Sequence, residues 1–273
     1  MRTVISKIAL AWVTVCFVFT GVASASDAPI RPRHVFDVGT ELSYIKYKEP
    51  GVMEQTGMMS GITGSYTFRD NVMLRAEARY SYGQVDYDGQ LSDGTPYVLN
   101  DIDDNMLEFR GLAGFDIELS EKTFVTPYTG FGYRYLNDDS SFDAAGYERE
   151  SNYFYSPVGV EALTYMDNGW SLGATVELDY LWKGLQKSHL GNFLVGLNTL
   201  ENDQEDGYGL RGSIRLEKKS EAMDWFIEPF VRYWNIDESE TDAVTYFGTP
   251  IGVEGYEPKN NSTEIGLKFA AKF

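Results

Sequence analysis

The residues that could do chemistry in this sequence are few and widely spaced. The chain of 273 residues has two histidines, His34 and His189, and a single cysteine, Cys16. An enzyme needs a nucleophile, an acid or a base held together in a cleft. The sequence has no Gly-x-Ser-x-Gly, His-Glu-x-x-His or P-loop motif (Gly-x-x-x-x-Gly-Lys-Ser/Thr). We therefore expect no cofactor, and the balance favours a protein that is not an enzyme.

One short acidic run could hold a metal ion. Asp101, Asp103 and Asp104 lie close together in the sequence, and carboxylates at this density suit calcium. The run lacks the glycine and the distal glutamate of an EF-hand loop. The three residues are therefore weak candidates for a cation site.

The elements that must position these residues show one repeated pattern, in which apolar residues alternate with polar or small ones. A period of two residues indicates β-strands with two different faces. Ten such segments can be drawn, namely 36–47, 58–69, 72–84, 106–119, 123–136, 152–166, 169–183, 207–218, 224–235 and a last one that ends at Phe273. The fold class is therefore all-β.

The connections between these segments alternate between short and long. Short turns follow the second, fourth, sixth and eighth segments, whereas the stretches 48–57, 85–105, 137–151, 184–206 and 236–262 are long and polar. The last four of these stretches together carry a net charge of −18, which equals the formal net charge of the whole chain. Short turns at one end and long loops at the other are typical of antiparallel transmembrane β-barrels in outer membranes.

The two faces of the segments favour a membrane barrel over a soluble sandwich. One face is apolar and has aromatic residues near the strand ends, as expected where hydrocarbon meets headgroups. The other face carries eleven acids and ten bases, among them Arg79, Glu108 and Lys183. A closed sheet pairs every backbone group in lipid. At ten strands the bore is narrow, so these long side chains should fill it.

The first residues predict export. A basic start, an apolar stretch and the small residues Ala23-Ser24-Ala25 have the layout of a signal peptide over residues 1–25, which also contains Cys16. We expect residues 26–273 to form one outer-membrane barrel domain with both termini in the periplasm. The long acidic loops would then be extracellular, and the strand that ends at Phe273 would be read by the insertion machinery.

Two resemblances bear on function. The segment Pro127-Tyr128-Thr129-Gly130-Phe131-Gly132-Tyr133 resembles a motif of small outer-membrane barrel proteins of Gram-negative bacteria, which implies no catalysis. More weakly, 83–88 and 157–182 resemble the omptin family of ten-stranded barrel proteases. That likeness implies Asp86, Asp88 and His189 as catalytic candidates around a water. The chain departs from the family at Lys187-Ser188-His189, where the acid that should orient the histidine is replaced by a base.

These observations lead to one main hypothesis and two alternatives. The main hypothesis is a non-enzymatic barrel with a narrow or closed lumen, serving envelope structure or adhesion and binding through acidic loops. The alternatives are an omptin-like protease or its inactive descendant, and a narrow channel. The expected partners are outer-membrane lipid and lipopolysaccharide, and cationic ligands at the loops. Nucleic acid is not expected as a partner.

Overall fold

The computed structural model describes residues 31–70, 72–91, 94–221 and 223–273. The predicted signal peptide over residues 1–25 lies outside these residues. Within the described ranges, no helix has the length and apolar character needed to cross a membrane. A single turn of 3-10 helix, η1 (Asp167–Gly169), is the one helical element named there, and strands make up the rest of the regular structure.

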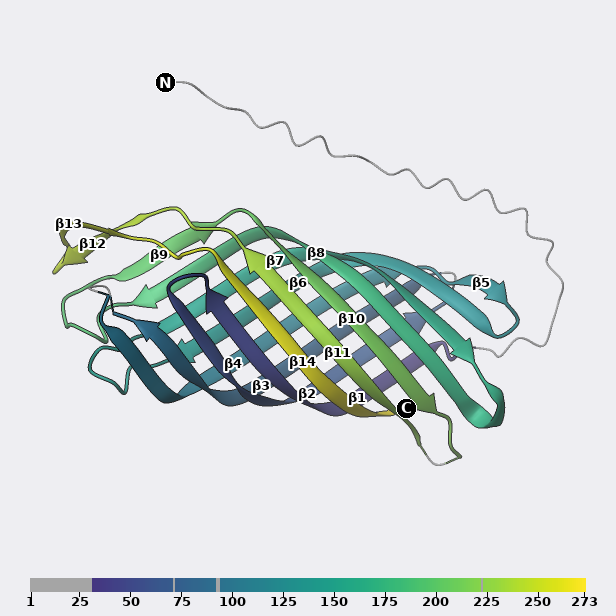
Figure 1. Ribbon diagram of the computed structural model, residues 1–273. Coiled ribbons are helices and arrows are strands. Elements are labelled where there is room, and N and C mark those ends of the chain that lie inside the picture. The colour runs from purple at the N-terminus through teal and green to yellow at the C-terminus, as the bar shows by residue number, and fades with distance from the viewer. Residues whose placement is uncertain (1–30, 71, 92–93, 222) are drawn as a thin grey trace, which may run out of the picture.

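Twelve strands form one closed antiparallel barrel, and two more form a separate hairpin, which confirms the predicted fold (Figure 1). Around the barrel the order is β1, β2, β3, β4, β6, β7, β8, β10, β11 and β14, and β14 pairs again with β1. The elements are β1 (His34–Glu49), β2 (Met53–Arg69), β3 (Met73–Gln90), β4 (Pro96–Gly114), β5 (Ile117–Ser120), β6 (Thr123–Asp139), β7 (Glu148–Tyr165), β8 (Trp170–His189), β9 (Thr199–Gln204), β10 (Gly207–Lys218), β11 (Asp224–Ile236), β12 (Asp242–Tyr246), β13 (Thr249–Gly255) and β14 (Asn260–Lys272).

Two of the ten barrel positions are shared by two strands each. The predicted continuous strand 106–119 is wrong, because pairing breaks after Gly114 and resumes in β5, which pairs with the start of β6. On the other side of the barrel, β9 pairs with the last six residues of β8 and β10 pairs with its first eleven. The stretch 184–206, expected as a loop, is therefore largely paired.

The same holds for the other long connections, most of which are strand rather than loop. β1 and β2 stay paired up to Glu49 and Met53, and β6 and β7 stay paired up to Asp139 and Glu148. Sequence alternation missed these parts because both faces are polar there. The barrel wall therefore continues well past the apolar band. We call its two ends the short-turn end and the long-loop end.

The outer surface has the belt structure expected for lipid contact. Large apolar side chains such as Val38, Ile62 and Val176 point outward and are 62, 63 and 70% exposed. At the short-turn end Trp170 packs edge-on against Trp225, with ring centroids 5.7 Å apart. Toward the long-loop end, Tyr180 and Trp182 make a similar pair at 5.6 Å. Aromatic rings at two levels mark the two interfaces of a bilayer.

One predicted inward side chain, Lys183, points outward instead. Tyr155 pairs with Leu181 and the adjacent Phe154 pairs with Lys183, so Trp182 is an extra residue in β8. Such a β-bulge puts two consecutive residues on one face and exchanges the faces of everything after it. Lys183 therefore lies outside and reaches Asp203, with Nζ and Oδ1 3.1 Å apart. The bulge also decides where His189 points.

Candidate functional site

The middle of the barrel lumen is filled by a network of ion pairs. Arg79 on β3 is its centre, because its guanidinium contacts the carboxylates of Glu41 at 2.8 Å and of both Glu108 and Glu264 at 3.0 Å. All four side chains are buried. Buried charges of this kind persist when each has partners of opposite sign.

A second arginine carries the network to the far wall. Arg211 on β10 also bonds Glu108, and its Nε lies 2.6 Å from Asp179 and 3.2 Å from Glu177 on β8. Glu108 thus accepts from two arginines on opposite sides of the bore. The charged residues that we predicted for the inner face therefore cross-link strands that are not neighbours.

An apolar layer lies on top of this network, toward the long-loop end. It consists of two clusters of buried side chains, Ile45, Met59, Val85, Ile102 and Met106 on one side and Tyr153, Tyr155, Leu181, Trp234 and Ile236 on the other. Tyr155 joins the two layers, since its hydroxyl donates to Glu108 at 2.6 Å. Its ring occupies the space over Gly132, where a Cβ would come within 2.2 Å of it.

Below the network, toward the short-turn end, the lumen holds a cavity of about 160 Å³ lined mainly by charged residues. Its arginines already have carboxylate partners. Arg69 contacts Asp116 at 2.6 Å, and Arg75 contacts Glu161 at 2.9 Å. Arg31, which enters from the N-terminal side, shares Asp116 at 2.8 Å. The positive charges of this cavity are therefore largely compensated by protein.

Above the apolar layer, a smaller charged cluster fills the part of the tube that projects past the membrane belt. Arg149 bridges Glu49 and Glu257 at 2.8 and 2.6 Å, and the Tyr47 hydroxyl donates to Glu257 at 2.8 Å. Two carboxylates share one guanidinium here. Burial and the neighbouring Glu49 raise the pKa of Glu257 to about 7, although Arg149 opposes this rise.

The candidate metal ligands Asp101, Asp103 and Asp104 are not brought together. Asp103 points outward and accepts from the Tyr82 hydroxyl at 2.6 Å. Asp104 points inward, opposite Asp138 on β6, and burial together with the Asp138 carboxyl raises its pKa well above the ordinary value. Asp101 takes a positive φ of 59°, and its N–H donates to Asp86 at 3.2 Å. Alternation sends these neighbours to opposite faces.

The catalytic candidates are also separated. Asp86 and Asp88 point outward from β3, whereas His189 lies at the end of β8, and β4, β6 and β7 stand between these strands in the barrel wall. The likeness to omptins implied that an aspartate pair and a histidine meet around a water. In this structure the three side chains do not face one another across a common cleft.

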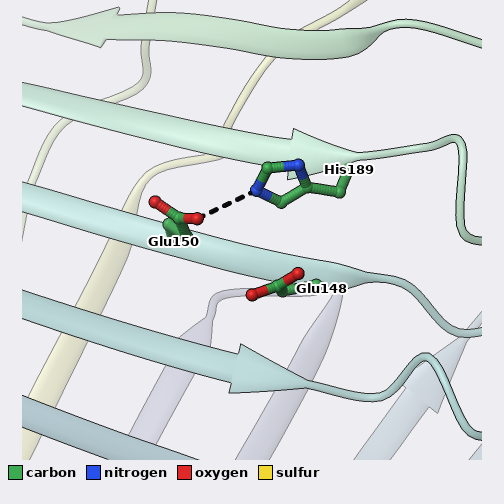
Figure 2. Close-up of side chains that lie close together, drawn as sticks. All are labelled: Glu148, Glu150 and His189. Carbon is green, nitrogen blue, oxygen red and sulfur yellow. Dashed lines mark hydrogen bonds and ion pairs between the residues drawn. The ribbon is translucent and has the colours of Figure 1, made fainter.

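His189 instead meets two residues that sequence reasoning missed, Glu148 and Glu150 on β7 (Figure 2). Its Nε2 lies 3.1 Å from Glu150 Oε1, and its Nδ1 lies 3.1 Å from the Thr199 hydroxyl on β9. The signal was present in part, because Glu148 and Glu150 alternate with Arg149 and so share a face. That this face meets His189 depends on the bulge in β8.

The tip of the long-loop end is apolar and exposed. It consists of the turn 190–198 and the hairpin β12–β13, which meet at the bridge between Leu197 and Tyr246 and lie together beyond the barrel rim (Figure 1). Val195 and Phe247 are 77 and 72% exposed. The other exposed apolar side chains of this tip are Phe193, Leu194, Tyr246, Ile251, Val253 and Tyr256.

Acidic side chains surround this tip. Glu201, Glu240 and Glu254 are exposed, and Asp242 is half-buried, with its carboxylate accepting from the Glu201 N–H at 3.1 Å. The acids of the long connections are thus of two kinds. Most of those at the tip are exposed, whereas Asp104, Asp138 and Glu257 are buried inside the tube.

The apolar outer band, the two aromatic belts and the filled lumen define an integral β-barrel of outer membranes. The chain belongs to the outer membrane protein beta-barrel domain family, whose model matches residues 15–198. No match is found among curated protein sequences. This membership places the protein in the outer membrane.

Solved barrel structures resemble this one distantly. The translocator domain of the autotransporter NalP from Neisseria meningitidis is 12% identical, with 88% of this chain and 89% of that chain covered and a TM-score of 0.40. Neisserial surface protein A is also 12% identical, with 87 and 97% covered and a TM-score of 0.36. The attachment invasion locus protein Ail of Yersinia pestis is 10% identical, with 88 and 99% covered and a TM-score of 0.30.

Proposed function

We propose that the protein is a non-enzymatic, non-conducting barrel that displays a binding surface at its long-loop end and captures a basic, partly apolar polypeptide there. The observation that carries this proposal is the exposed apolar tip with its acidic surround. The tip lies beyond the lipid-facing band, and exposed apolar side chains gathered in such a place mark interaction sites. The acids select a partner of positive charge.

The position of the chain ends supports a proposed orientation of the barrel. Phe273 pairs with Phe36 through two backbone hydrogen bonds of 3.0 and 2.8 Å, so both described ends lie at the short-turn end. In barrels of this type short turns face the periplasm and long loops face outward. The tip would then be presented outside the cell, where it meets soluble or surface-bound partners.

The filled lumen supports the non-conducting part of the proposal. A diffusion path needs a continuous polar bore, and here the layer around Tyr155 and Trp234 closes the space above the ion pairs. The two side chains are 0 and 3% exposed. A narrow channel is therefore less well supported than a closed barrel. Proteolysis is also less well supported, because the candidates Asp86, Asp88 and His189 do not meet in a common cleft among the described residues.

Binding can be tested with refolded protein in nanodiscs and a fluorescent basic amphipathic peptide. We expect saturable binding that weakens at high salt, because screening reduces attraction between exposed charges. The double variant Val195→Ser/Phe247→Ser should weaken it about tenfold, a loss in the range of one interface hot spot. Val98→Ser is the matched control, since Val98 is 61% exposed at the same end of the barrel but lies outside the tip.

Equal affinity of the tip variant and the Val98 control would contradict the binding surface. An acidic peptide of the same apolar content should not bind, and strong binding of it would remove the argument from charge. The closed lumen is tested separately by planar-bilayer recording. Discrete conductance steps of the wild-type protein would overturn the non-conducting part and favour the narrow channel.

A further inference from the structure

Three potential ligand atoms converge on the outer wall above the membrane belt. Glu148 and Glu150 begin β7, and His189 ends the neighbouring strand β8 (Figure 2). One ligand atom from each lies within 4.8 Å of the other two. The His189 Nε2 and the Glu150 Oε1 are already 3.1 Å apart. The side chains come from two paired strands, so their backbones are held in register.

These distances fit a shared metal ion after small side-chain rotations. Zinc binds histidine nitrogen and carboxylate oxygen at roughly 2.0–2.2 Å, so two ligands of one tetrahedral ion lie roughly 3.3–3.5 Å apart. Nε2 and Oε1 need to separate by a few tenths of an ångström to admit the ion. Glu148 needs to swing inward by about one ångström or more on this estimate.

The ring of His189 is held in the orientation that metal binding needs. Its other nitrogen, Nδ1, lies 3.1 Å from the hydroxyl of Thr199, the residue that pairs with it on β9. With a metal ion bound, Nδ1–H would donate to that hydroxyl and Nε2 would present its lone pair to the ion. A hydrogen bond on the distal nitrogen is the usual companion of a metal-binding histidine. Glu148 is held similarly, since Asn137 Nδ2 donates to it at 2.8 Å.

The charges around the three residues favour a cation. Asp139 on β6 pairs with Glu148 on β7 and adds a further carboxylate on this part of the wall. Two bases lie near the site, and both have other carboxylate partners. Lys187 pairs with Glu150 in register but directs its Nζ to Glu201, 3.1 Å away. Arg149, between the two glutamates, contacts Glu49 and Glu257 inside the tube. The side chains of His189 and Glu150 are 28 and 24% exposed. Water can therefore complete the coordination shell.

We propose that Glu148, Glu150 and His189 bind a divalent first-row transition metal, with zinc as the best fit. Carboxylates alone would suit calcium or magnesium, but the imidazole shifts the preference to zinc and its neighbours. The ion would also brace the tip, because the Glu148 N–H donates to Asn192 in the turn 190–198 at 3.3 Å. This site does not depend on the proposed function, and its test uses no peptide.

The test is a zinc titration by isothermal calorimetry. It uses refolded protein of residues 26–273 at about pH 7.5, where an ordinary histidine is neutral. We expect one zinc ion per chain. His189→Ala and Glu150→Gln should each weaken binding at least about tenfold. His34→Ala is the matched control. His34 is the other histidine of the sequence, and it lies at the start of β1, at the short-turn end of the barrel.

A second readout identifies the ligand nitrogen. Copper(II) bound to the wild-type protein should show coupling to imidazole nitrogen by electron paramagnetic resonance, and His189→Ala should lose that coupling while His34→Ala keeps it. The gel mobility of unboiled samples shows that every variant is folded.

Failure of the wild type to bind zinc saturably would overturn the proposal and leave His189 and Glu150 as a hydrogen-bonded pair. Unchanged affinity in His189→Ala would also overturn it, as would equal loss in His34→Ala. Calcium is the comparison ion. If calcium binds as tightly as zinc and independently of His189, the site is a carboxylate site and the assignment to a transition metal is wrong.

Discussion

The lumen and the tip of this barrel differ in which side chains they bury: the lumen buries charged side chains, whereas the tip exposes apolar ones. In the lumen, Glu41 and Glu108 are 3 and 2% exposed, and each carboxylate is bonded to arginine. At the tip, Val195 and Phe247 are 77 and 72% exposed. Charges that are fully paired inside serve the structure, whereas apolar groups left in water are available to a partner. The comparison therefore assigns stability to the lumen and recognition to the tip.

The largest expected effect comes from breaking the lumen network at its centre. Arg79→Ala would leave the buried carboxylates of Glu41, Glu108 and Glu264 without their common partner. Removing one member of a buried ion pair costs about 3–5 kcal/mol. We expect the unfolding midpoint in urea, followed by gel mobility of unboiled samples, to fall accordingly.

The control for this prediction is an arginine outside the lumen. Arg33 pairs with Asp70 at 2.5 Å, but the two side chains are 60 and 51% exposed. An exposed ion pair contributes about 0–1 kcal/mol, so Arg33→Ala should stay near the wild type. Similar losses in both variants would contradict the distinction between paired interior charges and solvated ones.

The next largest effect is expected in the apolar layer of the lumen. Tyr155→Ala would remove a fully buried ring and its hydrogen bond to Glu108. Truncation of a buried aromatic residue costs about 3–5 kcal/mol, with the low end expected where water can enter. We also expect brief conductance steps in planar bilayers, because the variant opens space above the ion pairs.

Phe142→Ala is the matched aromatic change outside, since Phe142 is 62% exposed in the turn that follows β6. It should change neither the unfolding midpoint nor the conductance. If Tyr155→Ala shows no conductance steps, the layer around Tyr155 is not what closes the lumen.

A smaller effect, of about 1–3 kcal/mol, is expected from the pH dependence of Glu257. Its pKa is raised from the ordinary 4.5 to about 7 in the folded protein. Because the folded state holds the proton more tightly, this stabilisation is present below pH 4.5 and is lost as the pH rises through about 7. Glu257→Gln should flatten the fall in stability over that range.

The measurement is the thermal midpoint of gel mobility between about pH 4 and 8, compared with Glu254→Gln, a change at an exposed glutamate of the same connection. The control should keep the wild-type slope. If Glu257→Gln loses thermal stability with rising pH as steeply as the wild type does, another titrating group causes the pH dependence.

The smallest effect on stability is expected at the tip. Phe247→Ser alters a side chain that is 72% exposed, and surface substitutions usually stay within about 0.5 kcal/mol. Peptide binding should nevertheless weaken, as in the double variant described above. A large loss of stability would mean that Phe247 holds the hairpin against the turn 190–198, and the contrast between lumen and tip would be lost.

Much of the fold was predictable because lipid imposes a strict rule on sequence. Every residue that faces hydrocarbon must be apolar, so alternation is clear in segments such as that of Val72, Leu74 and Ala76. Beyond the bilayer both faces meet water or protein, and the rule lapses. The extensions of β1, β6 and β7 therefore read as loops although they are paired strands.

The site residues were less predictable because faces depend on single-residue irregularities. The extra residue at Trp182 sends Lys183 outward and turns His189 toward Glu150 rather than into the tube. The local sequence pattern does not predict such a bulge. The separation of Asp86 from His189 is likewise set by the order of the strands around the barrel. Asp86 is on β3 and His189 on β8, and β4, β6 and β7 lie between these two strands.

By itself, the sequence determined the membrane barrel, its ten positions around the wall and the charged character of its inner face, because those follow from residue type repeated at period two. The tertiary structure decided which charges pair, as in Arg79 with Glu264, which lie 185 residues apart. It also decided that the apolar turn and hairpin meet at one exposed tip. Such contacts join distant strands, and their geometry is set by barrel closure and register rather than by any local preference.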